Sequence, residues 1–360
     1  MADLSVNLRG IRLKNPVMPA AGPQVRNAEC MMECVRQGVG ALVTKTISQE
    51  PAEIPRPCMQ QTKSGLFLNS ELWSEISAEQ WVKEEYEKCK YSGVPFIVSL
   101  GYTAEEIERL IPIVSPYADV IEISTHYMEK DIEPVIKSLK IAKLTDKPVY
   151  IKISPGITKI GWYVKRLVEE GADGFVAINS LGPCLNIDIE TGLPYLGSEK
   201  GYGWLSGKSL NPIALRYVYS IANSVKVPVI GAGGISSGED VIAMVMAGAS
   251  AVQICTAAIL EGPTVYSRII GEMDSWLNNH GYNTIEEIRG LTARKIAERK
   301  VITSPVFPNI DRGRCISCGK CARGCTYNAI EIKDTAVINK TKCFGCGLCI
   351  TRCPELAIKI

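Results

Sequence analysis

Short apolar runs alternate with amphipathic stretches along the first 260 residues or so. Eight runs read as strands, at residues 16–20, 41–46, 96–101, 120–125, 149–153, 174–179, 227–232 and 251–256. Stretches with helical periodicity, such as 104–113, 158–170 and 212–223, lie between them. Strands that are apolar throughout are typical of a parallel sheet covered on both faces. Eight strand–helix units predict an α/β fold, a closed (β/α)8 TIM barrel. An open doubly wound sheet is the alternative, but it usually carries a GxGxxG turn after its first strand, and that turn is absent here.

One uncharged stretch, residues 241–260, is long enough to cross a bilayer. It contains Gly248, Ser250 and Gln253, however, and its period changes midway from helical to a β-branched run. A buried helix followed by a buried strand explains this pattern better than a membrane span.

The chain divides near residue 304. Pro305 and Pro308 mark a connection, which predicts a barrel over residues 1–303 and a small α+β ferredoxin-like domain over 304–360. The net charge of +2 gives no indication of nucleic-acid or anionic-membrane binding. The first ten residues lack the apolar core of a signal peptide. Six cysteines outside the tail are scattered, which favours reduced thiols in a cytoplasmic protein; they are Cys30, Cys34, Cys58, Cys89, Cys184 and Cys255.

The tail carries one iron-binding signature twice. Eight cysteines repeat a spacing of two, two and three intervening residues, and Pro354 follows the second copy. This is the pattern of bacterial ferredoxins with two 4Fe-4S clusters, in which the fourth cysteine of each run crosses to the other cluster. A zinc ribbon, with more separated ligand pairs, and a disulfide framework are the alternatives. The predicted ligand sets are Cys315, Cys318, Cys321 and Cys353 for one cluster, and Cys343, Cys346, Cys349 and Cys325 for the other.

The ends of the predicted strands carry candidate binding groups. Gly233 and Gly234 follow the seventh strand and Thr256 ends the eighth, and the loops after these strands are the usual phosphate site of such barrels. Lys45 and Lys152 stand at strands two and five. A lysine in an apolar strand is costly to bury unless it meets an anion or a polar ligand; the alternative is a rim lysine that reaches water.

Neutral hydrogen-bonding groups complete this end of the predicted barrel. Asn69, Asn179 and Ser180 suit a planar, amide-rich ligand. A phosphate-bearing cofactor beside cations, on a chain with one-electron clusters, suggests a flavin, because a flavin stores two electrons and releases them as a hydride from N5. A cation near flavin N1 stabilises the reduced ring, and this is the role we predict for Lys152.

Several separate motifs, in order along the chain, resemble a known family. The barrel is similar to the FMN barrel of dihydroorotate dehydrogenases, and most similar to the barrel and C-terminal ferredoxin domain of dihydropyrimidine dehydrogenase. The motifs are NPVMPAAGP at 15–23, VTKT at 43–46, FLNSEL at 67–72, LSG at 205–207, PIALR at 212–216 and the two phosphate loops.

The resemblance implies FMN and two 4Fe-4S clusters as cofactors. It places Asn69, Asn179 and Ser180 against the substrate. The FAD and NADPH portion of the dihydropyrimidine enzyme is missing, so electrons are expected from a separate NAD(P)H/FAD subunit or a soluble ferredoxin, and family analogy implies a homodimer. The predicted FMN contacts are Ala20, Ala21, Gly22, Lys45, Thr46, Ser124, Lys152, Ser206, Gly207, Gly233, Gly234, Thr256 and Ala257.

The chain departs from the family pattern at the fourth strand. The family has an Asn there, followed by a proton-exchanging Cys on a long loop; here Ser124 stands at the Asn, Tyr127 at the Cys, and the loop is short. His126 or Tyr127 is therefore the candidate proton donor, with His126 favoured because imidazole titrates near neutral pH. The alternative is that both side chains only pack on the loop or against the flavin edge.

These observations predict an oxidoreductase that adds two electrons and two protons across an activated C=C bond. Hydride would come from flavin N5 and a proton from His126 or Tyr127, onto a uracil- or thymine-like ring or another conjugated cyclic carbonyl compound. After Asn69 the chain lacks the glycine found near orotate in dihydroorotate dehydrogenases, so a carboxylate substrate would be poorly served. The alternatives are a non-catalytic FMN and Fe–S electron-transfer subunit, and a dihydroorotate dehydrogenase.

Overall fold

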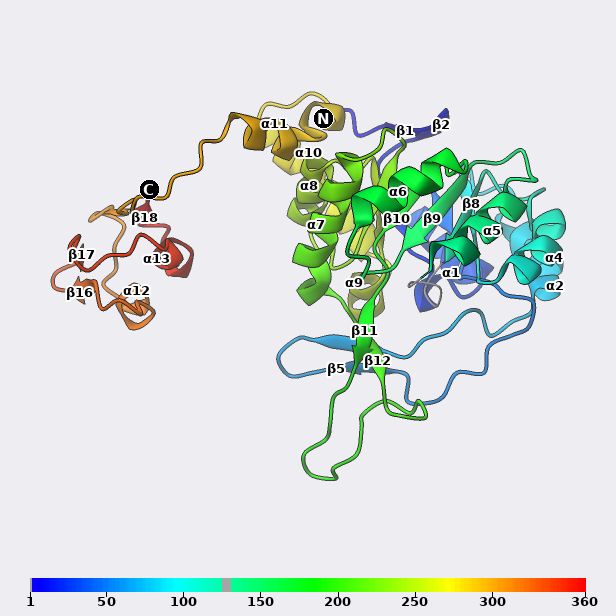
Figure 1. Ribbon diagram of the computed structural model, residues 1–360, viewed down its shortest axis with the longest axis horizontal. Coiled ribbons are helices and arrows are strands. Elements are labelled where there is room, and N and C mark those ends of the chain that lie inside the picture. Colours follow the sequence, from blue (N-terminus) through cyan, green and yellow to red (C-terminus); the bar gives the residue numbers. More distant parts are fainter. Residues whose placement is uncertain (1, 125–130) are drawn as a thin grey trace. The chain divides into compact units, whose positions relative to one another are not determined.

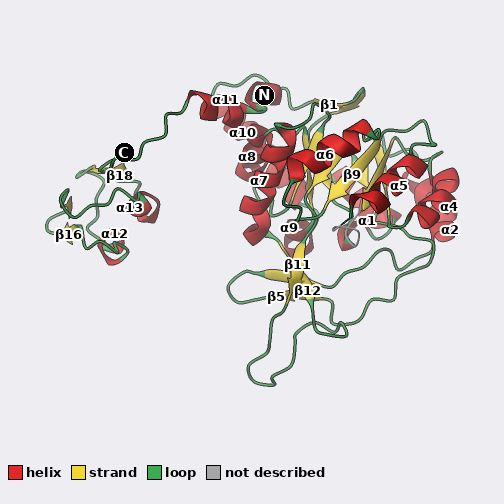
Figure 2. Cartoon of the chain, in the orientation of Figure 1, coloured by secondary structure: helices red, strands yellow, loops and turns green. Residues whose placement is uncertain are grey.

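A computed structural model describes residues 2–124 and 131–360. Two compact units make up the chain, Met1–Ala297 and Glu298–Ile360. Figures 1 and 2 show the elements of each unit, which are described separately below.

Eight parallel strands form the sheet of the first unit. In sheet order they are β3 (Val17–Pro19), β14 (Ala251–Ile254), β13 (Val229–Ala232), β10 (Gly174–Ala177), β9 (Val149–Ile153), β8 (Val120–Ser124), β7 (Phe96–Leu100) and β4 (Leu42–Val43). The two outer strands of this order meet as well, because the Gly40 N–H donates to the carbonyl of Val17 at 2.8 Å. The predicted (β/α)8 barrel is confirmed, and all eight predicted runs contain its strands.

Helices surround the barrel (Figure 2). Several begin where the chain offers a side-chain cap: Asn27, Thr103, Asp131 and Ser237 each accept a backbone N–H of the first helical turn, which satisfies donors that the helix cannot pair internally. The helices are α1 (Ala28–Arg36), α2 (Ala78–Gln80), α3 (Tyr86–Cys89), α4 (Ala104–Val114), α5 (Ile132–Ala142), α6 (Ile160–Glu169), α7 (Asn211–Ala222), α8 (Gly238–Ala247), α9 (Thr256–Glu261), α10 (Val265–Asn279) and α11 (Leu291–Glu298).

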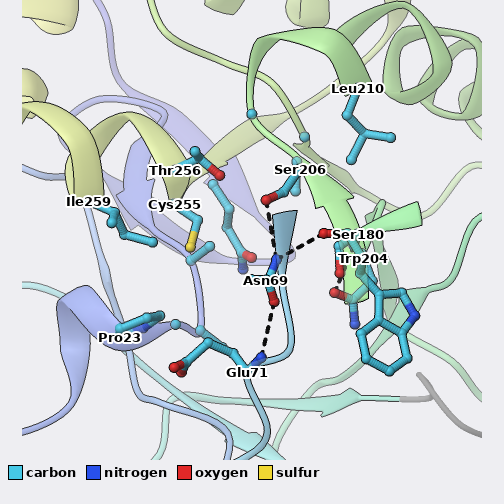
Figure 3. Close-up of a pocket in the computed structure, with 18 of the residues that line it drawn as sticks. Pro23, Asn69, Glu71, Ser180, Trp204, Ser206, Leu210, Cys255, Thr256 and Ile259 are labelled. Atoms are coloured by element: carbon cyan, nitrogen blue, oxygen red, sulfur yellow. Dashed lines mark hydrogen bonds between the residues drawn. The ribbon is translucent and has the colours of Figure 1, made fainter. Parts of the chain in front are cut away.

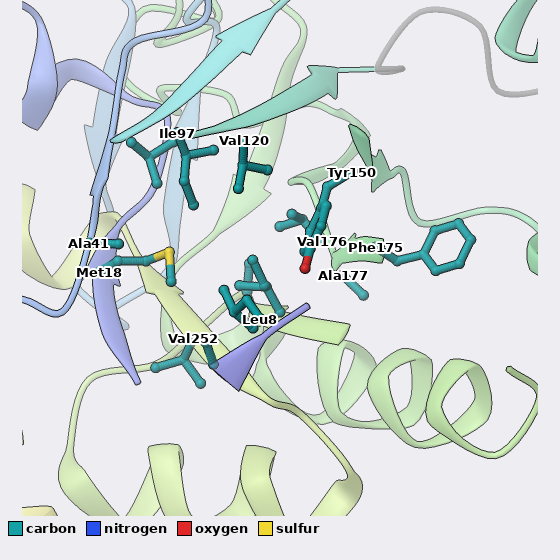
Figure 4. Packing of buried hydrophobic residues seen from close by; sticks show 14 of the residues in the cluster. Leu8, Met18, Ala41, Ile97, Val120, Tyr150, Phe175, Val176, Ala177 and Val252 are labelled. Atoms are coloured by element: carbon teal, nitrogen blue, oxygen red, sulfur yellow. The ribbon is translucent and has the colours of Figure 1, made fainter. Parts of the chain in front are cut away.

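Apolar side chains fill the barrel core (Figure 4). Met18, Val120, Phe175 and Val252 come from four different strands, and each is at most 1% exposed. Because strands buried on both faces place apolar side chains inward and outward alike, this core explains the uninterrupted apolar runs of the sequence.

Two further sheets lie at opposite ends of the barrel (Figure 1). One is the hairpin of β1 (Val6–Leu8) and β2 (Ile11–Leu13). The other is antiparallel, with the order β11 (Leu181–Cys184), β12 (Gly203–Ser206), β6 (Phe67–Asn69) and β5 (Met59–Gln61). β5 and β6 lie in the long segment between the second and third barrel strands, and the sequence analysis did not predict them. Each of these strands has only three residues, too few to show the alternation of apolar and polar positions that predicts a strand.

The uncharged stretch 241–260 is divided among α8, β14 and α9, as predicted. Within residues 2–124 and 131–360, none of the helices combines the length and apolarity needed to cross a membrane.

The second unit is small. Strand β15 (Asn309–Ile310) pairs with β18 (Ile358–Lys359), and β16 (Ile330–Ile332) pairs with β17 (Ala336–Ile338). Two short helices, α12 (Lys320–Arg323) and α13 (Leu348–Arg352), lie within the two cysteine runs. The buried core consists of Cys321, Ile330, Ala336 and Ile358, which is little apolar area for an independent fold.

Candidate functional site

A cavity opens at the carboxyl ends of the barrel strands, beside the antiparallel sheet. The space between its walls is about 1070 Å³, a volume that includes open solvent at the mouth. Fifteen of the predicted cofactor and substrate residues line it, and Ala257 does not. The lining residues are Ala20, Ala21, Gly22, Lys45, Thr46, Ser124, Lys152, Ser206, Gly207, Gly233, Gly234 and Thr256, with Asn69, Asn179 and Ser180.

Glycines shape the wall after the seventh strand. Gly234 has φ +73°, and a Cβ there would lie 2.6 Å from the backbone nitrogen of Asn211 and 2.8 Å from the carbonyl oxygen of Gly207. Only glycine therefore allows these loops to approach so closely without strain. The result is a backbone-lined recess where barrels of this class hold phosphate, and it fits the phosphate of FMN.

A buried polar cluster forms the floor of the cavity. Glu122, on β8, is fully buried and lies 3.4 Å from the ammonium of Lys152. The Nε2 of Gln253 donates to the same carboxylate at 2.6 Å. The Oε1 of Gln253 is buried and has no hydrogen-bond partner among the described residues. Because buried polar atoms are rarely left unpaired, this oxygen fits a ligand N–H, such as that of a flavin ring, in the cavity.

A second ion pair lies on the cavity wall. The ammonium of Lys45 is 2.5 Å from one oxygen of Glu71, and the Cys58 thiol donates to the other at 3.2 Å. Burial, together with the hydrogen bond to Glu71, raises the pKa of Cys58 to about 11. Lys45 and Lys152 are 4% and 6% exposed, so neither is the water-reaching rim lysine that was the alternative. Each meets an anion, as a buried lysine requires, but the anion belongs to the protein.

Sequence reasoning missed both carboxylates. Glu122 carried the same signal as Lys152, a charged residue inside an apolar strand, and β8 and β9 are adjacent in the sheet, with Ser124 opposite Lys152. Glu71 carried no comparable signal, because its pairing with Lys45 depends on how the segment after β6 folds back. Tyr102 and Trp204 also line the cavity and were not predicted.

Asn69 is held at the cavity by contacts across the antiparallel sheet (Figure 3). Its amide nitrogen donates to the hydroxyl of Ser206 at 3.3 Å and to the carbonyl of Trp204 at 3.4 Å, and its oxygen accepts the backbone N–H of Glu71 at 3.3 Å. The oxygen of Asn179 accepts the backbone N–H of Ser180 at 2.9 Å. The cavity thus combines neutral amides with one paired carboxylate. His126 and Tyr127 lie outside the described residues, so their roles stay predictions.

In the second unit, two smaller cavities are each lined by one predicted cysteine set. Cys315, Cys318, Cys321 and Cys353 line the first; Cys325, Cys343, Cys346 and Cys349 line the second, which Cys321 also borders. The crossing of the fourth cysteine in each run is therefore present in the geometry. Among the described residues, no three Cys, His, Asp or Glu side chains converge tightly enough to hold a single metal ion.

Backbone N–H groups point at the sulfur atoms in this unit. Ala329 donates to Cys325 at 3.4 Å, Ala336 to Cys315 at 3.5 Å and Ala357 to Cys353 at 3.3 Å. The backbone donors lower the pKa of Cys315. Hydrogen bonds of this kind stabilise thiolate ligands and tune the potentials of Fe–S clusters, so the residues present fit the predicted clusters.

The chain matches two known protein families. Residues 3–277 match the dihydroorotate dehydrogenase family, and residues 308–360 match the 4Fe-4S dicluster domain. The two matches fall in the two compact units.

Similar proteins include catalytic subunits of dihydroorotate dehydrogenase B (NAD(+)). The subunit from Pyrococcus abyssi is 35% identical over 309 residues, which cover 81% of this chain and 99% of that protein. Those from Methanothermobacter thermautotrophicus and Geobacter metallireducens are 32% and 34% identical over 80% of this chain, and 98% and 97% of their own lengths. About a fifth of this chain lies outside each alignment. By these matches the chain belongs to the dihydroorotate dehydrogenase family of FMN-binding oxidoreductases and carries, in addition, a 4Fe-4S dicluster domain.

Proposed function

We propose that the protein is an FMN- and Fe–S-dependent reductase that acts on the C=C bond of a neutral ring bearing N–H groups, such as a uracil- or thymine-like pyrimidine. The observation that carries this proposal is the Glu71 carboxylate on the cavity wall, beside Asn69. A carboxylate accepts hydrogen bonds from ring N–H groups and repels a second carboxylate. Another conjugated cyclic carbonyl compound with an N–H or O–H donor fits the same wall.

FMN at the barrel mouth would exchange single electrons with the clusters and a hydride with the substrate. The chain's own residues would bind the cofactor and orient the substrate. The Gly207–Gly234 contact would accommodate the phosphate, and the Gln253 amide and the Lys152 ammonium would face the ring. Glu122, 3.4 Å away, offsets the charge of Lys152 in a buried place.

Substrate would be oriented by Asn69, Asn179 and Ser180, and its N–H groups would meet Glu71. Lys45 pairs with the Glu71 carboxylate and fixes its direction. The proton for the carbon next to the hydride acceptor would come from His126 or Tyr127. That assignment rests on their place in the sequence, two and three residues after Ser124, where the resemblance places the acid of the family. If replacing both side chains left turnover unchanged, the acid would have to be sought elsewhere.

Dihydroorotate oxidation is the second candidate, and the relatives favour it. They are named as catalytic subunits of an NAD(+)-dependent dihydroorotate dehydrogenase, which also supports electron exchange with a separate subunit. Orotate carries a carboxylate, however, and in this chain the residues after Asn69 supply an anion there. Repulsion between the Glu71 carboxylate and the orotate carboxylate therefore distinguishes the two candidate functions.

The test is anaerobic. The reconstituted protein is reduced, and flavin reoxidation is followed after mixing with uracil, thymine, orotate and a few unsaturated cyclic lactams. We expect a neutral ring to reoxidise the flavin and orotate to leave it reduced. Glu71→Gln should slow the response to the neutral ring on the order of tenfold or more, the loss expected when a hydrogen bond to a charged acceptor is removed. Glu75→Gln, an exposed position four residues on, is the matched control.

Rapid reoxidation by orotate, or bleaching of the oxidised flavin by dihydroorotate, would assign the chain to dihydroorotate chemistry. A flavin that every ring compound leaves reduced would instead indicate an electron-transfer subunit in which FMN serves only as a relay.

A further inference from the structure

The two units differ in charge. Residues 298–360 contain eleven Lys and Arg and five Asp and Glu, whereas residues 1–297 contain 29 and 33. Between residues 299 and 360, which the structure describes in full, the one ion pair joins Arg314 and Asp311. Most cations of the second unit therefore have no ion-pair partner within it.

Several of these cations flank the second cysteine cavity. Lys340 and Lys342 are exposed and precede Cys343 directly. The side chain of Arg352 lies across Gly324, which lines this cavity: a Cβ on that glycine would be 2.8 Å from Arg352 Cδ. Lys340 and Lys342 precede α13 and Arg352 is its last residue, so cations from two segments of the chain border the residues that line this cavity.

An apolar patch lies inside this basic rim. The rings of Tyr327 and Phe344 stack at 4.9 Å with an interplanar angle of 13°. Tyr327, Phe344 and Leu348 are 43%, 62% and 47% exposed, and all three line the second cavity. Exposed aromatic and aliphatic side chains surrounded by charge are the usual anatomy of a protein–protein interface.

We propose that an acidic one-electron carrier protein docks on this surface and reduces the cluster held by Cys325, Cys343, Cys346 and Cys349. Tyr327, Phe344 and Leu348 form the contact centre, and the basic rim orients the carrier. In each encounter the carrier loses one electron and the cluster gains it, with no proton or bond exchanged. Two such encounters supply the electron pair that the proposed reductase uses. This inference rests on the proposed function in one respect only: the Fe–S clusters must be bound.

The chemistry of the partner follows from charge complementarity. A cationic face at an electron-transfer site selects an anionic partner and raises the association rate, an effect that salt suppresses. A contact centre of three side chains is small, as is typical of weak redox encounters, which must dissociate after each electron.

The experiment uses the full-length holoprotein, with iron content and cluster absorbance measured first. A reduced, acidic two-cluster bacterial ferredoxin is the probe, and cluster reduction is followed by stopped-flow absorbance at about 20 mM and about 500 mM salt, where charges are weakly and strongly screened. The test variant is Lys340→Glu/Lys342→Glu. The control variant, Lys333→Glu/Lys359→Glu, makes the same change in net charge but follows Ile332 and Ile358, which line the first cavity.

We expect the test variant to be reduced on the order of tenfold more slowly than wild type at low salt, and the control to change less than twofold. The difference should vanish at high salt, and full reduction by excess dithionite should reach the same end point in every protein. Equal slowing of both variants would overturn the assignment to the second cluster. Unchanged rates in both would overturn docking on this unit. Absence of clusters in the wild-type protein would instead refute the Fe–S part of the proposed function.

Discussion

At the residue scale, the cavity is governed by two lysine–carboxylate pairs. Lys152 with Glu122 lies at its floor and Lys45 with Glu71 on its wall. Each lysine alone would be expensive to bury, and each carboxylate alone would repel an anionic ligand. As pairs their charges offset each other, so a ligand responds to the direction of the hydrogen-bonding groups rather than to a net charge. Glu71 is an unexpected residue in a chain of the dihydroorotate dehydrogenase family. In the proposed substrate position, a ring that bears a carboxylate would have to approach it.

The pKa of the Cys58 thiol is sensitive to Glu71 on the cavity wall. Its pKa is raised to about 11 from an ordinary value of 9.0, by burial first and then by Glu71. Because the thiolate is the reactive form, a rise of this size leaves roughly a hundredfold less thiolate at pH 8 than in a free cysteine. We expect alkylation of Cys58 by iodoacetamide to be correspondingly slow at pH 8 and to accelerate until the pH nears 11.

Glu71→Gln should lower the pKa of Cys58 and accelerate its alkylation at pH 8, because it removes a negative neighbour. Peptide mass spectrometry resolves Cys58 from the other cysteines. Glu75→Gln serves again as the control. An unchanged rate in Glu71→Gln would show that the Cys58–Glu71 contact does not govern this thiol.

At the element scale, the site depends on loops that follow separate strands and meet over the barrel. The turn after β13 touches the loop after β12 at Gly234 and Gly207, and β6 brings Asn69 against Ser206. In the proposed assignment, the small antiparallel sheet positions Asn69 for the substrate, and the turn after β13 shapes the recess for the cofactor phosphate. A change in either contact should affect one ligand and not the other.

Gly234→Ala should lower the FMN content of the purified protein, because its Cβ would force apart the loops at Asn211 and Gly207. Gly262→Ala is the matched control: Gly262 also has a positive φ, +83°, but no atom lies within 4 Å of its Cβ position. Both variants should lose about 1 kcal/mol of stability through backbone strain, and only Gly234→Ala should lose flavin. FMN fluorescence after acid release measures the content, and equal flavin loss in both would attribute the effect to strain alone.

At the scale of the whole molecule, the two units differ in how they are held together. The barrel unit has a large apolar core, whereas the second unit has a core cluster of four buried side chains and two cavities lined by cysteines. A domain with so small a core depends on its metal for folding. Iron is thus expected to be structural in the second unit as well as redox-active.

Removing iron with a chelator under oxidising conditions should unfold residues 308–360 and leave the barrel folded. Hydrogen–deuterium exchange with mass spectrometry should then show loss of protection in peptides from this unit only, while β7–β10 peptides keep theirs. Retained protection in both units would show that the apolar core of the second unit suffices without clusters.

Local pattern determined much of this protein. Apolar strands with helical stretches between them identified the barrel, because residues buried on both faces of a parallel sheet are apolar regardless of what packs on them. Cysteine spacing predicted the two ligand sets. Each set takes three cysteines from one run and the fourth cysteine of the other run, and the spacing that indicates this is local and occurs twice. Gly233, Gly234, Lys45 and Lys152 were found because strand ends of a barrel converge on one mouth.

Tertiary structure alone decided the rest. The partners of the two lysines, the sheet that holds Asn69, and the orphaned oxygen of Gln253 depend on contacts between segments up to 137 residues apart. No local periodicity encodes such contacts, because which side chain meets Lys45 is determined by how the chain after β6 returns to the mouth. The basic surface of the second unit depends on both sequence and fold. Its charged residues can be read from the sequence, but only the fold gathers them around one cavity.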